Sequence, residues 1–337
     1  DLKRLGGIGV NSELTPDSER KFSNHTMKSE WDANSVSAWI LARLIWNPAE
    51  NPRALRDYYL ERTFREAAPQ MKRFYDLLDE EEISTDPAVP STINEARGAV
   101  EFKNVRFGYT PDRILMKDIN FSVKPGQKVA VVGSTGAGKT TLINLLMRFY
   151  ELNGGAIFLD GVDTKEMNRS ALRSNFGMVL QDTWLFGGTI ADNIAYSRPE
   201  ASRDEIAAAA KAARVDFFVR TMSHGYDTVL SNDAENISIG QRQLLTIARV
   251  FLCDPAVIIL DEATSSVDTR TEIEIGKAMK ALMKNRTSFV IAHRLSTIID
   301  ADLILFMQNG NIIEQGTHET LLKANGAYAD LYYSQFA

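Results

Sequence analysis

The chain has 337 residues, of which 44% are hydrophobic and 24% charged, and it carries a formal net charge of -6. This length and ordinary composition exclude a wholly disordered chain and suffice for two domains or one large α/β domain. The sequence lacks the basic excess of a dedicated nucleic-acid binder, so we expect no nucleic-acid partner. Its single cysteine, Cys253, excludes an internal disulfide framework and a cysteine-based zinc cluster.

Residues 1–82 are predicted to form a small, mainly helical segment. Apolar side chains recur at spacings of three and four over 31–46 and 52–78, as in amphipathic helices. The most apolar stretch, 37–46, is much shorter than the roughly 20 residues that cross a bilayer and contains Arg43, so we expect no membrane span. An acidic run and a stretch rich in Ser, Thr and Pro then predict an exposed linker over 83–98.

Short β runs that alternate with helices begin at Val100 and predict an α/β domain over 99–337. Several runs are continuously apolar, which favours strands buried on both faces of a largely parallel sheet. A helical pattern dominates 182–250 and predicts a helical insertion between two strands. The expected strands are Val100–Phe107, Lys128–Val132, Ala156–Leu159, Gly177–Leu180, Val257–Leu260, Ser288–Ala292 and Leu303–Met307.

The most informative motif is a glycine-rich loop, G-x-x-x-x-G-K-T. An apolar strand run ends directly before it and a helix pattern begins directly after it, which is the context the motif requires. Glycines let backbone N–H groups approach phosphate oxygens, and the helix N-terminus favours their negative charge. We expect Lys139 at the β- and γ-phosphates and the Thr140 hydroxyl on Mg²⁺. The predicted phosphate-binding residues are Gly133, Ser134, Thr135, Gly136, Ala137, Gly138, Lys139, Thr140 and Thr141.

Two adjacent carboxylates, Asp261 and Glu262, directly follow the apolar run 256–260. Beside a phosphate loop, an ionised Asp261 is placed to hold Mg²⁺ directly or through water. Glu262 is then the candidate general base that polarises the attacking water. The alternative is a charge cluster at a helix N-terminus without a catalytic role.

From residue 99 to the C-terminus these motifs resemble the nucleotide-binding domain of ATP-binding cassette (ABC) proteins. The resemblance implies a P-loop fold with a mostly parallel core sheet, an antiparallel β subdomain and a helical subdomain. It also implies that Tyr109 stacks on adenine, and that Gln181 contacts Mg²⁺ and takes part in catalysis. By the same resemblance, His293 contacts the γ-phosphate and Asp268 belongs to a loop that crosses a dimer interface.

The segment 237–241 corresponds to the family signature, usually Leu-Ser-Gly-Gly-Gln, with Ile239 in place of the first glycine. The resemblance implies that Ser238, Gly240 and Gln241 bind ATP held by a second subunit in a head-to-tail dimer. The added bulk of Ile239 is expected to weaken that site, as in heterodimeric exporters with one impaired site. A homodimer and a heterodimer both remain open.

Short sequence motifs similar to those of the exporter branch of the family occur at 182–186, 261–265, 292–297 and 313–318. The resemblance implies an ATPase with ATP and Mg²⁺ as cofactors, which powers export through a transmembrane domain in a separate or missing segment. Its expected location is the cytoplasm, at the inner face of the cell membrane. The alternative is a non-catalytic or partner-dependent ATP-binding module, as a truncated or chimeric fragment would be.

Residues 1–76 are similar instead to the end of an uncharacterised domain found beside carbohydrate-degrading enzymes. The similarity rests on the run Leu-Ile-Trp-Asn-Pro at 44–48, on Tyr58 and Tyr59, and on 66–69. We interpret the chain as two unrelated fragments joined near 77–82. A gene fusion, a truncation or an error in assembling the sequence could produce such a chain. A divergent helical extension of the ATP-binding domain is the alternative, and we assign no chemistry to this segment.

Overall fold

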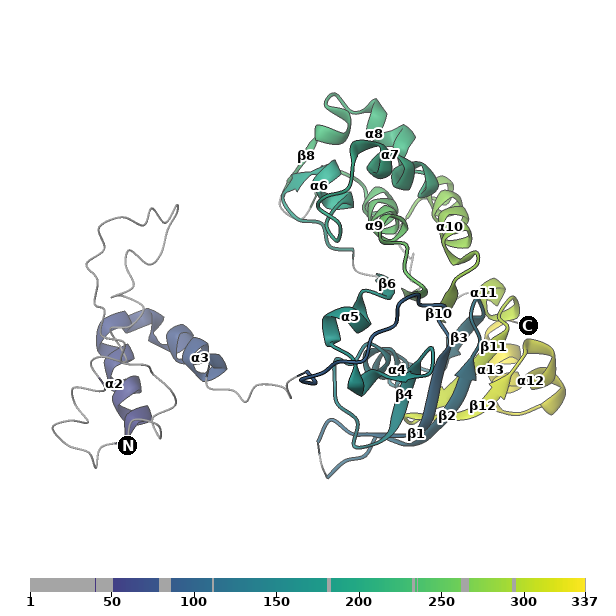
Figure 1. The fold of residues 1–337 in the computed structure, drawn as a ribbon, viewed down its shortest axis with the longest axis horizontal. Helices are drawn as coiled ribbons and strands as arrows, with labels where there is room; N and C mark the ends of the chain where they lie inside the picture. The colour runs from purple at the N-terminus through teal and green to yellow at the C-terminus, as the bar shows by residue number, and fades with distance from the viewer. Residues whose placement is uncertain are drawn as a thin grey trace. The chain divides into compact units, whose positions relative to one another are not determined.

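The structure is a computed structural model, and it describes residues 40, 51–78, 86–110, 112–180, 183–231, 234, 236–261, 267–292 and 295–336. The chain divides into two units, 1–85 and 86–337, and each is described by itself (Figure 1). None of the helices within the described ranges has the length and apolarity that a membrane span requires.

The described part of unit 1 is a pair of helices, which confirms the helical pattern over 52–78. Asn51 caps the first helix by accepting hydrogen bonds from two backbone N–H groups, and Pro52 occupies the first helical turn. The helix ends at Arg65, whose φ of 46° and ψ of -111° are not helical. The expected helix over 31–46 lies outside the described residues except for Ile40. The elements are α2 (Pro52–Phe64), η2 (Arg65–Ala67) and α3 (Ala68–Leu78).

Unit 2 contains a six-stranded sheet of order β12-β11-β3-β10-β9-β6, parallel except for the edge strand β12. Its central strands are almost entirely buried on both faces, which explains their continuous apolar sequences. The strands are β3 (Lys128–Val132), β6 (Phe176–Val179), β9 (Val257–Asp261), β10 (Thr287–Ile291), β11 (Leu303–Gln308) and β12 (Asn311–Gly316).

A second sheet of four strands, in the order β2-β1-β4-β5, is antiparallel throughout. Strand β2 was absent from the strands expected from sequence. Its buried residues alternate with exposed ones, because one face of this sheet lies in solvent. Such alternation is a weaker sequence signal than the continuous apolar runs of the core strands. The strands are β1 (Val100–Phe107), β2 (Met116–Val123), β4 (Gly154–Leu159) and β5 (Val162–Asp163).

Helices flank the sheets and also form a separate group, as Figure 1 shows for α6 to α9. This group is the predicted helical insertion, and it shares a hydrophobic cluster with α10 and with one face of the core sheet. The α/β prediction, with its mostly parallel core, antiparallel sheet and helical subdomain, is confirmed. The remaining elements are η3 (Thr164–Glu166), α4 (Lys139–Leu146), α5 (Arg169–Arg173), β7 (Gly188–Thr189), α6 (Ile190–Ile194), α7 (Arg203–Ala212), α8 (Asp216–Thr221), η4 (Gly225–Asp227), β8 (Val229–Leu230), α9 (Ile239–Cys253), α10 (Thr269–Met283), α11 (Leu295–Ile299), α12 (His318–Ala324) and α13 (Ala327–Phe336).

Residues 86–98, part of the expected exposed linker, belong to unit 2 and are hydrogen-bonded to the rest of it. The Asp86 carboxylate accepts hydrogen bonds from the backbone N–H and the guanidinium of Arg169, at 3.1 and 2.8 Å. Ser91 forms a parallel bridge with Met167. Carboxylates and backbone groups distant in sequence thus give this polar segment the partners that a composition-based prediction cannot foresee.

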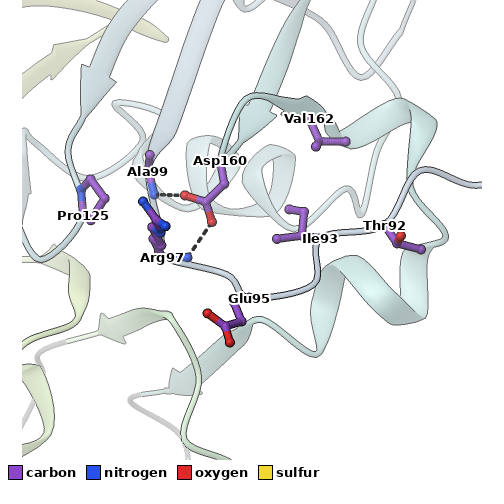
Figure 2. Close-up of a pocket in the computed structure, with 8 residues that line it drawn as sticks. All are labelled: Thr92, Ile93, Glu95, Arg97, Ala99, Pro125, Asp160 and Val162. Carbon is purple, nitrogen blue, oxygen red and sulfur yellow. Dashed lines mark hydrogen bonds between the residues drawn. The ribbon is translucent and has the colours of Figure 1, made fainter.

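Asp160 fixes the end of that segment, and its two oxygens face the backbone of 97–99 (Figure 2). They accept hydrogen bonds from the N–H groups of Arg97, Gly98 and Ala99 at 2.7, 3.1 and 2.7 Å. Asp160 has a φ of 49°, a left-handed conformation that Asp tolerates better than most residues. An open pocket of about 490 Å³ lies beside this segment, and Pro125 and Val162 also line it.

We expect Asp160→Ala to lower the free energy of unfolding of unit 2 by about 2 kcal/mol, because three N–H groups lose an ionised acceptor. Asp160→Asn is the matched control, since it keeps one acceptor oxygen and the tolerance for a positive φ, and it should cost less. Urea denaturation of the full chain, followed by circular dichroism, measures both. Equal stability of the alanine variant and the original chain would contradict this role.

Candidate nucleotide-binding site

The loop 133–138 connects the carboxyl end of β3 to the first turn of α4. Three of its glycines have positive φ angles: 152° at Gly133, 81° at Gly136 and 102° at Gly138, which caps α4. A Cβ atom at Gly133 would collide with the carbonyl oxygen of Met307 on the neighbouring strand β11. The loop therefore takes a course that only glycine allows at its first position.

Lys139 points back into this loop instead of toward solvent. Its ammonium group donates hydrogen bonds to the carbonyl oxygens of Gly133 and Ser134, at 2.7 and 3.0 Å, and the residue is only 9% exposed. Burial lowers the pKa of Lys139, and the negative charge of Asp261 acts in the opposite direction. A cation is thus buried inside a loop of backbone dipoles, where an incoming phosphate would meet it.

Asp261 lies at the carboxyl end of β9, which is separated from β3 by the single strand β10. It is paired with Ile291 of β10, which is paired in turn with Val131 of β3. Because these strands are parallel, Asp261 and the start of the phosphate loop share one edge of the sheet. The structure therefore places Asp261 at the same edge of the sheet as the loop around Lys139, and its charge raises the pKa of the lysine.

Three predicted catalytic residues, Gln181, Glu262 and His293, lie outside the described residues. Strands β6, β9 and β10 precede them, and all three strands are parallel to β3 and end at the edge where the phosphate loop begins. Their roles stay predictions.

The chemistry of Thr140 and Asp261 fits Mg²⁺, which prefers hard oxygen ligands and often keeps only one or two protein ligands beside phosphates. Within the described ranges no group of three or more His, Cys, Asp or Glu side chains could hold a metal ion. A magnesium site here would accordingly need oxygens from a bound nucleotide to complete it.

Tyr109 follows β1 and is 55% exposed. Its hydroxyl shares a hydrogen bond of 2.8 Å with the Thr141 hydroxyl, so the expected adenine-stacking ring lies next to the phosphate loop. The ring is also edge-on to Phe107 and Tyr150, at centroid distances of 5.0 and 5.2 Å. Sequence reasoning missed Tyr150, although two consecutive aromatic residues after the phosphate-loop helix were an available signal.

The signature residues lie at the start of α9. Ser238 caps this helix by accepting a hydrogen bond from the Gln241 N–H at 3.2 Å, and the Gln241 side chain accepts one from the Ser238 N–H at 2.8 Å. Gly240 faces Thr271 of α10 so closely that a Cβ atom would collide with it. Ile239 is 45% exposed, which leaves its bulk at the surface beside Ser238.

Asp268 caps α10 by accepting a hydrogen bond from the Thr271 N–H at 3.0 Å, and this backbone hydrogen bond lowers the pKa of its carboxyl. Gly240 and Asp268 therefore lie around the same threonine. In the described part of the chain no hydrogen bond joins Ser238, Gly240 or Gln241 to the phosphate loop. Helices α4 and α9 also belong to different hydrophobic clusters.

Gly133→Ala should lower the free energy of unfolding by about 3 kcal/mol, because the added methyl group must displace the backbone of β11. The matched variant is Gly136→Ala, where φ is also positive but no atom lies within 4 Å of the added Cβ, so only backbone strain of about 1 kcal/mol is expected. Thermal and urea unfolding compare the two variants. Equal losses would show that the approach to Met307 does not constrain the loop.

Two known families match separate parts of the chain. Residues 116–265 match the family described as ABC transporter. Residues 14–76 match a domain of unknown function, DUF4838. The predicted similarity of residues 1–76 to an uncharacterised domain is confirmed by the second match.

Among curated relatives, the chain is 57% identical over 257 residues to the fatty acid ABC transporter ATP-binding/permease protein of Mycobacterium tuberculosis, covering 76% of this chain and 40% of that protein. It is 43% identical over 265 residues to human ATP-binding cassette sub-family B member 6, covering 79% and 32%. It is 41% identical over 301 residues to the uncharacterized ABC transporter ATP-binding protein YwjA of Bacillus subtilis, covering 89% and 52%. The chain thus spans about a third to a half of the length of these relatives. The coverage of 89% exceeds what residues 86–337 provide, so that similarity extends into unit 1.

A solved structure of a bacterial Atm1-family ABC exporter with ATP bound has a similar fold. The TM-score is 0.72 at 36% sequence identity, and the match covers 90% of this chain and 57% of that chain.

Proposed function

The chain contains an ATP-binding domain of the ABC transporter family, and from this premise we propose that it binds ATP with Mg²⁺ and hydrolyses it. The observation that carries the proposal is the buried Lys139, which the glycine loop encloses at the sheet edge where β9 ends in Asp261. Backbone N–H groups of the loop and of the first turn of α4 bind the phosphates. Lys139 then exchanges its carbonyl partners for phosphate oxygens.

Catalysis in this proposal depends on positioning and on charge stabilisation. Thr140 and Asp261 would hold Mg²⁺, which would supply positive charge to neutralise the phosphates. Glu262 orients and polarises the attacking water, and His293 stabilises the transferred phosphoryl group. Gln181 completes the contacts to the magnesium and Tyr109 stacks on the adenine.

The signature completes the site from a second copy or a related domain, in a head-to-tail dimer. Supporting this, α4 and α9 pack in separate hydrophobic clusters, and the described residues show no hydrogen bond between the phosphate loop and Ser238. The relatives are named ATP-binding/permease proteins and exporters. We therefore infer that hydrolysis powers export through a transmembrane domain, with this domain on the cytoplasmic side of the membrane.

A partner-dependent ATP-binding module is the second candidate, and the exposed Ile239 favours it. In a homodimer both ATP sites would be completed by a signature with this isoleucine beside Ser238, where the family usually has glycine. In a heterodimer the partner supplies one intact signature.

Glu262→Gln should slow MgATP turnover by about 100-fold or more while leaving ATP binding intact, because only the general base is lost. Glu319→Gln is the control, since Glu319 is an exposed carboxylate on α12. Steady-state phosphate release from the full chain measures both variants. Unchanged turnover in Glu262→Gln would remove Glu262 from the role of base.

Turnover per chain should rise with protein concentration if the chain dimerises with itself, because each site then needs two copies. Chelation of Mg²⁺ with excess EDTA should abolish phosphate release. ATP binding without turnover at any concentration would contradict a self-sufficient ATPase and support the partner-dependent module.

A further inference from the structure

Arg249, about one turn before the end of α9, makes an unusual set of contacts. Its guanidinium donates to the backbone oxygen and the side-chain oxygen of Asn193, at 2.5 and 2.7 Å, and to the carbonyl oxygen of Trp184 at 2.7 Å. It also lies over the ring of Tyr196, 5.3 Å from the centroid. We call these contacts the Arg249 clamp.

Asn193 extends the clamp to the segment that follows β6. This residue is fully buried in α6, and its side-chain oxygen accepts from the Phe186 N–H at 3.1 Å. Its side-chain nitrogen donates to the carbonyl oxygens of Phe186 and Thr189, at 3.0 and 3.1 Å. Every one of these bonds ends on the backbone of 183–189, so the network specifies the path of that segment.

The Arg249 clamp joins two places that the proposed reaction uses. The segment 183–189 begins two residues after Gln181, the predicted magnesium contact. Arg249 lies eleven residues after Ser238 on one continuous helix, a distance of about 16 Å along the axis. Hydrogen bonds from side chain to backbone therefore join the helix that carries the signature to the segment that leaves the core sheet.

We propose that Arg249 is a positioning residue, which holds the segment 183–189 on α9 so that the magnesium contact and the signature serine move as one body during ATP hydrolysis. This inference rests on the proposed function. Arg249 contacts neither nucleotide nor metal in it, and acts only through the segment 183–189.

Arg249 is partly buried, and removing its charge from water costs free energy. We infer from this cost that the fixed geometry of its hydrogen bonds, and not stability alone, is the reason for an arginine at this position. Burial lowers the pKa of Arg249 to about 10, so the cation is kept at neutral pH despite the loss of water around it. Well-packed apolar side chains often replace buried charges without loss of stability. A guanidinium differs from an apolar side chain in holding several carbonyl oxygens at fixed angles.

The test compares Arg249→Gln with Arg286→Gln in the full chain. Arg286 is a matched control because it also bonds a backbone carbonyl oxygen, that of Leu282, pairs with Asp254 and lies over the ring of Phe251. Among the described residues, it makes no hydrogen bond, ion pair or ring contact with 183–189. Both variants lose a half-buried guanidinium, so general destabilisation is shared between them.

Hydrogen exchange of the 183–189 amides gives the first readout, without nucleotide. Faster exchange there in Arg249→Gln but not in Arg286→Gln is expected, and the Phe186 N–H reports most directly because it is bonded to Asn193. Unchanged exchange of this segment in Arg249→Gln would overturn the proposal, whether or not the chain hydrolyses ATP.

Turnover gives the second readout. We expect Arg249→Gln to lower kcat roughly 10- to 100-fold with little change in KM for ATP, because displaced catalytic geometry costs rate more than binding. Arg249→Lys should recover part of kcat. A loss of kcat no larger than in Arg286→Gln would overturn the proposal. If the original chain has no turnover, the proposed function fails, and the exchange readout alone decides whether Arg249 positions the segment.

Discussion

The close approach of β3 and β11 at the end of the core sheet is the constraint on which the candidate site depends. Gly133 leaves β3 so near the Met307 carbonyl oxygen that no side chain fits there. The turn after β11 holds the loop a second time, since the Gly310 N–H donates to the Ala137 carbonyl oxygen at 2.9 Å. Held on this side, the loop directs its carbonyl oxygens at Lys139 and closes around that cation.

Two of the three hydrophobic clusters in the described part of unit 2 lie on opposite faces of the core sheet, and the phosphate loop and the signature belong to different ones. One contains the phosphate-loop helix, the antiparallel sheet and one face of the core sheet. The other contains α9, the remaining insertion helices, α10 and the opposite face of the core sheet. The phosphate loop and the signature therefore belong to clusters on opposite faces of one sheet. The Arg249 clamp ties the segment that leaves this sheet after β6 to α9.

The sequence was sufficient to predict elements with a strong local signal. The buried parallel strands have continuous apolar runs, and the phosphate loop has a motif whose spacing follows from the geometry of a strand, a turn and a helix. Strand β2 was missed because its buried residues alternate with exposed ones and form no continuous apolar run. The docked segment 86–98 was missed because its structure depends on partners distant in sequence, such as Asp160 for 97–99. Arg249 was missed for the same reason, since its partners lie more than fifty residues away in sequence.

Calorimetric titration of the full chain with MgATP, beside Lys139→Met, tests the central claim most directly. If the loop 133–141 holds the phosphates, the original chain binds ATP and the variant binds it about 10-fold or more weakly, because an ionised donor to the phosphates is lost. The methionine retains the length of the buried stem, so the fold of the loop should persist. Equal affinity in the two proteins would contradict the assignment of this loop as the nucleotide site.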